Sequence, residues 1–307
     1  MIYLVGPTSS GKTSLALKIC KKFNKEIISA DSRQIYKHFD IGTGKVPINS
    51  REVSIEKHSD YWVIDGVKIH MYDVCDANFN YSVADFLKDT KNLIEEDKII
   101  VGGTGLYIDN LLGLKKPSPV PPNLKLRVAL EAKSLEELQS MLSKEILDAM
   151  NQSDINNKRR LMRKIEIQGH QSTDPSIKDK IDIKDFGLVN LAKDPMVVIL
   201  DIPREELFKR VDDWVDSIWM PLLSEVEMLI SLGYKDSFPM QGLIYKTVLD
   251  FFIKKITESE AVWVIKNDLH AYIRRQRTWF NKYNQPYIHR FNSNDRAFSY
   301  IESILAN

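Results

Sequence analysis

The chain has 307 residues, of which 43% are hydrophobic and 28% charged, and its 43 basic and 42 acidic residues leave a net charge of +1. This composition is typical of a soluble globular protein, and the balanced charge argues against a uniformly basic nucleic-acid binder while leaving room for a local basic face. Two cysteines, Cys20 and Cys75, are too few for a disulfide framework or a four-ligand zinc site, so we expect free thiols in a reducing compartment.

The sequence gives no sign of membrane insertion or export. It contains no run of about 18 apolar residues, the length that a membrane-spanning helix needs. The first residues, MIYLVG, lead directly into a glycine-containing loop and lack a basic leader. We therefore expect a cytoplasmic protein.

The first third of the chain alternates short apolar runs with helical patterns. Strands are predicted at Ile2–Val5, Glu26–Ala30, Ile69–Val74 and Lys98–Val101. Helices are predicted at Thr13–Phe23 and Ser82–Glu95, where apolar residues recur at helical spacing. Strands that alternate with helices indicate parallel β-α-β units.

The pattern changes at Pro117, where PSPVPP (117–122) predicts an extended joint. We interpret 117–190 as a helical insertion, with helices at Leu124–Leu130, Leu135–Met150 and Arg159–Gln168 and a polar loop at Ser172–Asp185. The sheet resumes with a strand at Met196–Asp201, so residues 1–116 and 191–307 form one core. That second part continues with helices at 203–232, 241–256 and 258–283 and a strand at Tyr287–Phe291.

Residues 6–13 read GPTSSGKT, in which Gly6, Gly11, Lys12 and Thr13 fill the pattern G-x-x-x-x-G-K-[ST]. Such a loop points backbone N–H groups at an anion, Lys12 adds a cation, and the Thr13 hydroxyl can bind magnesium. A nucleotide hydrolase usually adds an acid at a strand end. Asp201 has that position but is interpreted as a structural strand end. The loop therefore predicts binding of a polyphosphate or pyrophosphate without requiring phosphoryl transfer.

Asp31 directly follows the strand EIISA. The carboxyl ends of parallel strands meet at the ligand crevice of an open sheet, so this carboxylate is a candidate general base. An Asp at this position is also typical of a turn, and the residues alone leave both roles open. Gln34, three residues on, has an amide that can read the edge of an adenine.

Several segments, in their order, resemble tRNA dimethylallyltransferases: GPTSSGKT, SADSRQIYKHFDIGTGK (29–45), YSVADF (81–86) and VGGTGLY (101–107). The later segments KRRLMRKIE (158–166), DIPREELFKRVDDWV (201–215), MQGLIYK (240–246) and RRQRTWF (274–280) are similar to that family as well. The resemblance covers nearly the whole chain. It implies a P-loop NTPase-like parallel sheet flanked by helices, with a helical insertion domain at 117–190 that contacts the tRNA anticodon stem-loop.

The implied reaction is transfer of a dimethylallyl group from dimethylallyl diphosphate to the exocyclic amine of adenosine 37, in tRNAs that read codons beginning with U. The resemblance assigns catalysis to Asp31 as base, with Thr104 and Arg210 on the diphosphate. It assigns diphosphate binding to Gly6, Pro7, Thr8, Ser9, Ser10, Gly11, Lys12 and Thr13, with Mg²⁺ as cofactor on Thr13. It assigns tRNA binding to Asp31, Ser32, Arg33, Gln34, Thr104, Arg127, Arg159, Arg160, Arg163, Gln241, Tyr245, Lys246, Arg274 and Arg275.

Without the resemblance, the basic residues of 158–164 and 274–277 would equally fit solvated helix faces. We expect a monomer, because the long helices are accounted for by the core and by RNA binding.

Two positions depart from the family pattern. Ile244 stands where the family usually has glycine, and His270 stands where an arginine is usual. Glycine allows backbone conformations that isoleucine adopts only at a cost. We therefore expect an altered tRNA contact or a narrower choice of substrate.

Three other functions compete with this one. A related adenylate isopentenyltransferase would modify free AMP or ADP, but the insertion with its basic helix favours a macromolecular acceptor. A small-molecule or nucleotide kinase would turn over ATP alone. A non-catalytic RNA-binding module would not need Lys12, Thr13 and Asp31 intact.

Overall fold

The computed structural model describes residues 1–47, 53–94, 97–118, 120–173 and 194–306, with side chains described up to 170 in the fourth range. The chain divides into two compact units, one of Met1–Lys115 with Phe186–Asn307 and one of Lys116–Asp185. The second unit is the segment interpreted from the sequence as a helical insertion.

The first unit is built on one sheet, which in the described residues has eight strands in the order β3-β4-β5-β2-β6-β1-β7-β8. Six strands run parallel: β1 (Ile2–Val5), β2 (Glu26–Ser29), β5 (Val67–His70), β6 (Lys98–Gly102), β7 (Met196–Leu200) and β8 (Ile288–Phe291). Leu4 of β1 lies between Val101 of β6 and Val198 of β7. The predicted parallel sheet, including its return after the insertion, is confirmed.

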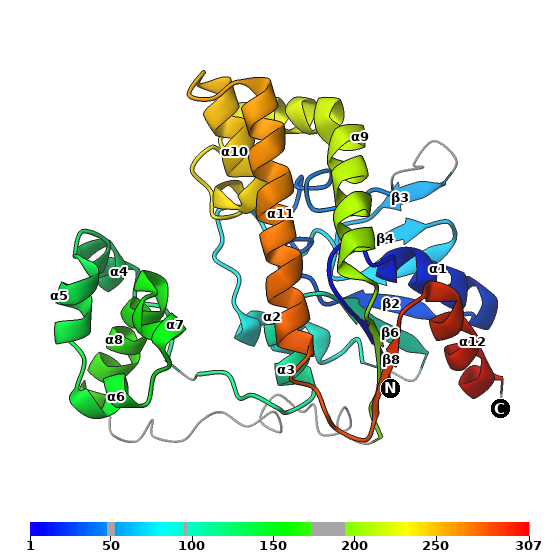
Figure 1. Ribbon diagram of the computed structural model, residues 1–307, viewed down its shortest axis with the longest axis horizontal. Coiled ribbons are helices and arrows are strands. Elements are labelled where there is room, and N and C mark those ends of the chain that lie inside the picture. Colours follow the sequence, from blue (N-terminus) through cyan, green and yellow to red (C-terminus); the bar gives the residue numbers. More distant parts are fainter. Residues whose placement is uncertain (48–52, 95–96, 119, 174–193, 307) are drawn as a thin grey trace. The chain divides into compact units, whose positions relative to one another are not determined.

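Helices cover both faces of this sheet, which is why β1 and β6 are fully buried and read as continuous apolar runs. In Figure 1, α1 (Lys12–Phe23) and α12 (Asn294–Leu305) lie side by side on one face. The other face carries α2 (Val83–Thr90) and α3 (Gly105–Leu111). Both cysteines are free and buried, as expected.

The structure differs from the local predictions at two element ends and includes elements that were not predicted, α3 among them. β5 ends at His70, short of the predicted Val74, because Met71 and Asp73 have left-handed φ angles of 68° and 58°. The antiparallel edge strands β3 (Ile55–Lys57) and β4 (Tyr61–Ile64) were not predicted, nor was α12. α2 ends at Thr90, before the predicted Glu95.

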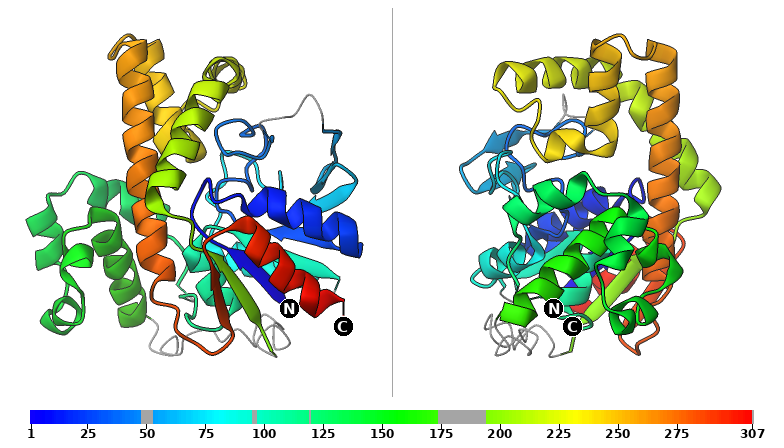
Figure 2. Two further views of the ribbon diagram at one scale, coloured as in Figure 1. Left: turned by 45° about the vertical axis from the view of Figure 1, so that its right-hand side comes forward. Right: turned by 90° about the vertical axis from the view of Figure 1, so that its left-hand side faces the viewer.

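Three long helices stand together beyond the sheet: α9 (Arg204–Ser231), α10 (Leu243–Phe252) and α11 (Glu258–Phe280) (Figures 1 and 2). The helices predicted at 203–232, 241–256 and 258–283 are thus confirmed, with shorter ends. A 3-10 turn, Pro239–Gln241, precedes α10. The predicted cap of α11 is present, since Thr257 and Glu260 each bond the other's backbone N–H. Within the described residues no helix is both long and apolar enough to span a bilayer.

The second unit contains α4 (Leu124–Glu131), α5 (Leu135–Ser140), α6 (Lys144–Asp148), α7 (Gln152–Ile155) and α8 (Lys158–Thr173). The prediction of one helix over Leu135–Met150 is wrong, because the chain turns between Met141 and Ser143, which is the N-cap of α6. α8 includes Ser172 and Thr173, and the rest of the loop predicted at Ser172–Asp185 lies outside the described residues. The unit has a small core of its own, built from Leu130, Leu138, Leu142, Met150, Leu161, Met162 and Ile165.

Candidate active site

A cavity of 1270 Å³ lies in the first unit at the carboxyl ends of β1, β2 and β6, with α9, α10 and α11 on its other sides. Ligands of open parallel sheets bind at this edge, because the loops after neighbouring strands converge there. Of the residues predicted to act, those lining the cavity are Thr8, Ser9, Gly11, Lys12, Thr13, Asp31, Ser32, Arg33, Gln34, Arg210, Tyr245 and Arg275.

The phosphate loop connects β1 to α1, as its sequence pattern requires. Gly11 has a φ of 84°, a left-handed conformation that favours glycine, and α1 begins at the next residue. The Lys12 ammonium group donates to the carbonyl of Pro7 and lies 3.5 Å from the Ser10 hydroxyl. Burial lowers the pKa of Lys12 to about 8, although the negative charge of Asp31 acts in the opposite direction. Lys12 is therefore still mainly a cation at neutral pH.

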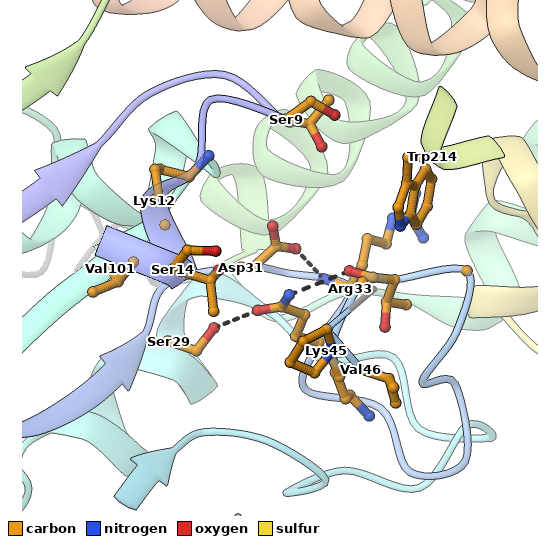
Figure 3. Close-up of a pocket in the computed structure, with 18 of the residues that line it drawn as sticks. Ser9, Lys12, Ser14, Ser29, Asp31, Arg33, Lys45, Val46, Val101 and Trp214 are labelled. Atoms are coloured by element: carbon orange, nitrogen blue, oxygen red, sulfur yellow. Dashed lines mark hydrogen bonds between the residues drawn. The ribbon is translucent and has the colours of Figure 1, made fainter. Parts of the chain in front are cut away.

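Asp31 lies just beyond β2, and its carboxylate faces the same space as Lys12 (Figure 3). Its Oδ1 accepts a hydrogen bond of 2.9 Å from the backbone N–H of Arg33. This is the turn interaction that the sequence allowed. The residue is half-buried and lines the cavity, so its turn role and a role toward a ligand are compatible.

Thr104 does not line the cavity but holds a residue that does. It follows β6 and is the N-cap of α3. Its Oγ1 accepts a 3.0 Å bond from the backbone N–H of Ser32 and lies 3.3 Å from the Ser32 hydroxyl. Thr104 thereby ties the loop after β6 to the turn that carries Asp31.

Arg210 of α9 reaches the phosphate loop from the opposite side. Its guanidinium group lies 3.4 Å from the carbonyl oxygen of Ser9 and pairs with Glu206 one turn earlier. Arg210 is half-exposed and lines the cavity, so it can turn toward an anion held by the loop.

Two residues predicted to bind tRNA use their polar atoms inside the protein. The Gln34 amide accepts from the Ser29 hydroxyl at 2.8 Å and donates to the Thr43 carbonyl at 3.2 Å. Tyr245 is buried, and its hydroxyl donates to Glu225 at 3.0 Å. Arg33 differs, because its Nη1 is buried without a hydrogen-bond partner among the described residues.

The other predicted residues of the first unit, apart from Thr104, also do not line the cavity. Three residues of the phosphate loop are buried and do not line the cavity: Gly6, Pro7 and Ser10. Three others are exposed: Gln241, Lys246 and Arg274. In the second unit Arg127 and Arg163 both bond the buried carboxylate of Glu166. Arg160 pairs with Asp154, and Arg159 is exposed.

The two departures from the family pattern have simple structural accounts. Ile244 lies in the first turn of α10 and is not among the residues with a left-handed φ, so its backbone carries no such strain. Its buried side chain lines the cavity. His270 of α11 bonds Asp212 at 2.8 Å and stacks on the Phe208 ring at 4.0 Å.

Sequence reasoning missed two buried residues beside this site, Glu225 of α9 and Gln276 of α11. Glu225 follows Leu222 by three residues and precedes Leu229 by four, so it lies on the apolar face of the helix. A charged residue at such a position could have indicated a buried carboxylate with a structural or functional role. Gln276 stands inside an arginine-rich run and offered no distinguishing signal.

The residues present fit a magnesium ion held mainly by substrate oxygens. Among the described residues no group of three or more His, Cys, Asp or Glu side chains could hold a metal. Asp201 does not line the cavity, and it faces Arg277 at 3.3 Å and Arg290 at 3.8 Å. Thr13 lines the cavity, and its hydroxyl would be the protein's ligand to such an ion, since Mg²⁺ commonly combines few protein ligands with phosphate oxygens.

Fold and site define a phosphate-loop α/β protein whose cavity joins an anion-binding loop to a strand-end carboxylate. Residues 34–283 match the IPP transferase family model, and the chain belongs to the IPP transferase family. It is 34% identical over 98% of its length to a tRNA dimethylallyltransferase of Carboxydothermus hydrogenoformans, of which it covers 94%. A tRNA dimethylallyltransferase of Clostridioides difficile is also 34% identical, with 92% of this chain and 89% of that protein covered.

Solved structures agree with this assignment. The tRNA isopentenylpyrophosphate transferase of Bacillus halodurans is 27% identical with a TM-score of 0.64, and the match covers 99% of this chain and 95% of that one. A eukaryotic dimethylallyltransferase acting on tRNA gives a TM-score of 0.70 at 23% identity, covering 100% of this chain and 79% of that one, and supports the fold alone. The predicted fold class is confirmed.

Proposed function

We propose that this protein transfers a dimethylallyl group from dimethylallyl diphosphate to the exocyclic amine of adenosine 37, in tRNAs that read codons beginning with U. The observation that carries the proposal is one cavity that contains both the phosphate loop and Asp31, whereas Asp201, the acid that follows β7, does not line it and faces Arg277 and Arg290. The family and the curated relatives named tRNA dimethylallyltransferase support the same reaction.

The phosphate loop holds the diphosphate, which is the leaving group. Lys12 and the backbone N–H groups at the start of α1 stabilise the charge that develops on its oxygen as the carbon–oxygen bond breaks. Arg210, beside Ser9, adds a second cation. The Thr13 hydroxyl would hold Mg²⁺, and the bound ion would supply further positive charge at the leaving group. Leu17, Ile27 and Ile69 give the same cavity an apolar surface that suits the five-carbon group.

The acceptor amine is a weak nucleophile, since its lone pair is delocalised into the adenine ring. As the new carbon–nitrogen bond forms, Asp31 takes the proton from the amine, a step that contributes about 10²–10⁴-fold to such reactions. The adenine must leave its stack to reach the cavity, as in other enzymes that modify a base. Arg33, with its unpartnered buried Nη1, and Ser32 lie where the base would enter.

The test is transfer of labelled dimethylallyl to three acceptors: total tRNA, an anticodon stem-loop with adenosine at position 37, and AMP. Label in tRNA and stem-loop but not in AMP is expected. Label in AMP alone would assign the protein to the adenylate isopentenyltransferases, and turnover of ATP without label transfer would indicate a kinase.

The catalytic assignment is tested with Asp31→Ala. We expect it to bind tRNA and diphosphate normally but to lose roughly 10²–10⁴-fold in single-turnover rate. The exposed Asp60, which pairs only with neighbouring Ser59 among the described contacts, provides the control Asp60→Ala. A near-normal rate in Asp31→Ala would remove Asp31 as the base.

We further propose a cytoplasmic enzyme that works as a monomer. The long helices α9 and α11 bury apolar residues such as Val211, Leu222 and Ile265 in the core of the first unit. Sedimentation showing a stable dimer at working concentration would contradict this.

A further inference from the structure

Gln276 joins two loops that come from different strands of the sheet. It lies on α11 and is only 6% exposed. Its Oε1 accepts a 2.8 Å hydrogen bond from the backbone N–H of Thr8, in the phosphate loop after β1. Its Nε2 donates a 2.9 Å bond to the carbonyl of Gly103, in the loop after β6.

The orientation of this amide follows from its partners. The Thr8 N–H can only donate and the Gly103 carbonyl can only accept, so both ends of the side chain are matched. Since the amide is buried, losing it would leave two backbone groups unpaired in the interior.

The surroundings hold Gln276 close to the loop after β6. A Cβ on Gly103 would lie 2.5 Å from Nε2, so the contact requires a residue without a side chain there. One turn further along α11, Trp279 packs against Gly105, where a Cβ would lie 2.4 Å from the indole. The indole N–H of Trp279 also bonds Asp109 of α3 at 3.1 Å. The helix is thus docked at several points on this loop and on the helix that follows it.

The two loops carry different parts of the proposed chemistry. The phosphate loop continues to Lys12, on the side of the leaving group. The loop after β6 continues to Thr104, which holds the N–H of Ser32 beside the proposed base Asp31. The distance between the leaving group and the base therefore depends on the distance between these loops.

We propose that Gln276 is a positioning residue that holds the phosphate loop and the Thr104 loop in the register that prenyl transfer requires. This inference rests on the proposed function. Gln276 touches neither Lys12 nor Asp31 in the hydrogen bonds described, and it acts through Thr8 and Gly103.

The first measurement is amide hydrogen exchange of the full-length chain, wild type against Gln276→Ala. Exchange at residues 6–13 and 102–105 is expected to be faster in the variant, because the Thr8 N–H loses its acceptor. The control Asn267→Ala removes an exposed amide from the same helix and should change neither segment. Unchanged exchange in Gln276→Ala would show that Gln276 does not hold the two loops together.

The second measurement is the single-turnover rate with folded enzyme in saturating excess over a labelled stem-loop, a condition in which the rate constant does not depend on the fraction of enzyme that is folded. Gln276→Ala should be roughly 100-fold slower, the scale of a misplacement near 1 Å, with the Kd for inorganic diphosphate within about threefold of wild type. An unchanged rate, or a loss confined to diphosphate affinity, would refute the positioning role.

A third comparison uses Gly103→Ala, whose new methyl group must displace the Gln276 amide. Alone it should slow transfer, but in the Gln276→Ala background it should add little, because both changes break one contact. Additive losses would contradict the inference. A wild-type protein that transfers no label would instead refute the proposed function, so the two failures can be told apart.

Discussion

Replacement of Glu225 tests how the loop on one side of the cavity is held in place. This side chain is 7% exposed and accepts backbone N–H groups from three consecutive residues, Asp40, Ile41 at 2.8 Å and Gly42 at 3.1 Å. The Tyr245 hydroxyl is its fourth donor, at 3.0 Å. The loop so anchored continues through residues 42–47, which line the cavity.

Glu225→Ala removes the common acceptor of four donors in a buried place. Each donor left unpaired costs about 1–3 kcal/mol, but water and local relaxation recover part of that, so we expect a loss near 4 kcal/mol in the free energy of unfolding. Glu225→Gln retains one oxygen for Asp40 and Ile41 but turns an N–H toward Gly42. Its loss should therefore be smaller, about 1–2 kcal/mol.

Urea unfolding followed by tryptophan fluorescence measures these losses. Glu227, exposed two residues along α9, provides matched controls as Glu227→Ala and Glu227→Gln, each expected within about 0.5 kcal/mol of wild type. If Glu225→Ala loses less than about 1 kcal/mol, the loop does not depend on this carboxylate and the reasoning fails.

The free energy of unfolding of the wild type and of Glu225→Gln should depend differently on pH. Burial raises the pKa of Glu225 above its usual 4.5, and the three backbone donors only partly oppose it. Between 4.5 and the raised pKa the native state therefore holds a proton that the unfolded chain has released. Stability conferred at this position falls as pH rises through that window. Glu225→Gln lacks the titration, so its deficit relative to wild type should shrink over the same window.

Further predictions concern Arg127, Arg159, Glu166 and Thr104. Arg127→Ala should destabilise the second unit by about 1–3 kcal/mol, because the buried Glu166 loses two hydrogen bonds but keeps Arg163. Exposed Arg159→Ala should alter RNA affinity without a stability change, as thermal unfolding and stem-loop titration would show. Hydrogen bonds from Arg127 and others lower the pKa of Glu166 against the effect of burial, so this stabilisation should be present above pH 4.5 and disappear on acidification. Thr104→Val should slow transfer more than Thr104→Ser, which keeps a hydroxyl for Ser32; equal rates would exclude that bond from catalysis.

The features that could be predicted from sequence are those encoded over a few neighbouring residues. GPTSSGKT specifies its loop through glycine conformation and the helix that follows, and the apolar run at Ile2–Val5 specifies a strand covered on both faces. The edge strand Ile55–Lys57 was not predicted because none of its side chains is buried, so its sequence shows no alternation of apolar and polar residues. Residue chemistry alone also left Asp31 with two roles.

Contacts between segments that are far apart in the sequence could not be predicted from the sequence. Arg127 and Arg163 were assigned to tRNA by resemblance. Arg163 meets Glu166 one turn along α8, a local pair, but the contact of Arg127 with Glu166 depends on the packing of α4 against α8, which no local pattern describes. Gln276 meets a residue 268 positions away and another 173 positions away. Such pairs follow from the sheet order, which short sequence windows do not determine.

Because the pKa of the half-buried Lys12 is lowered, we expect diphosphate binding to take up a proton under alkaline conditions. Above its pKa of about 8 the amine of the free protein is mostly neutral, whereas a bound diphosphate beside it would raise that pKa and draw a proton from solvent. Calorimetric binding heats should then vary with the ionisation enthalpy of the buffer at pH 9 and much less at pH 7. Lys12 would thus remain protonated to a higher pH when the diphosphate is bound.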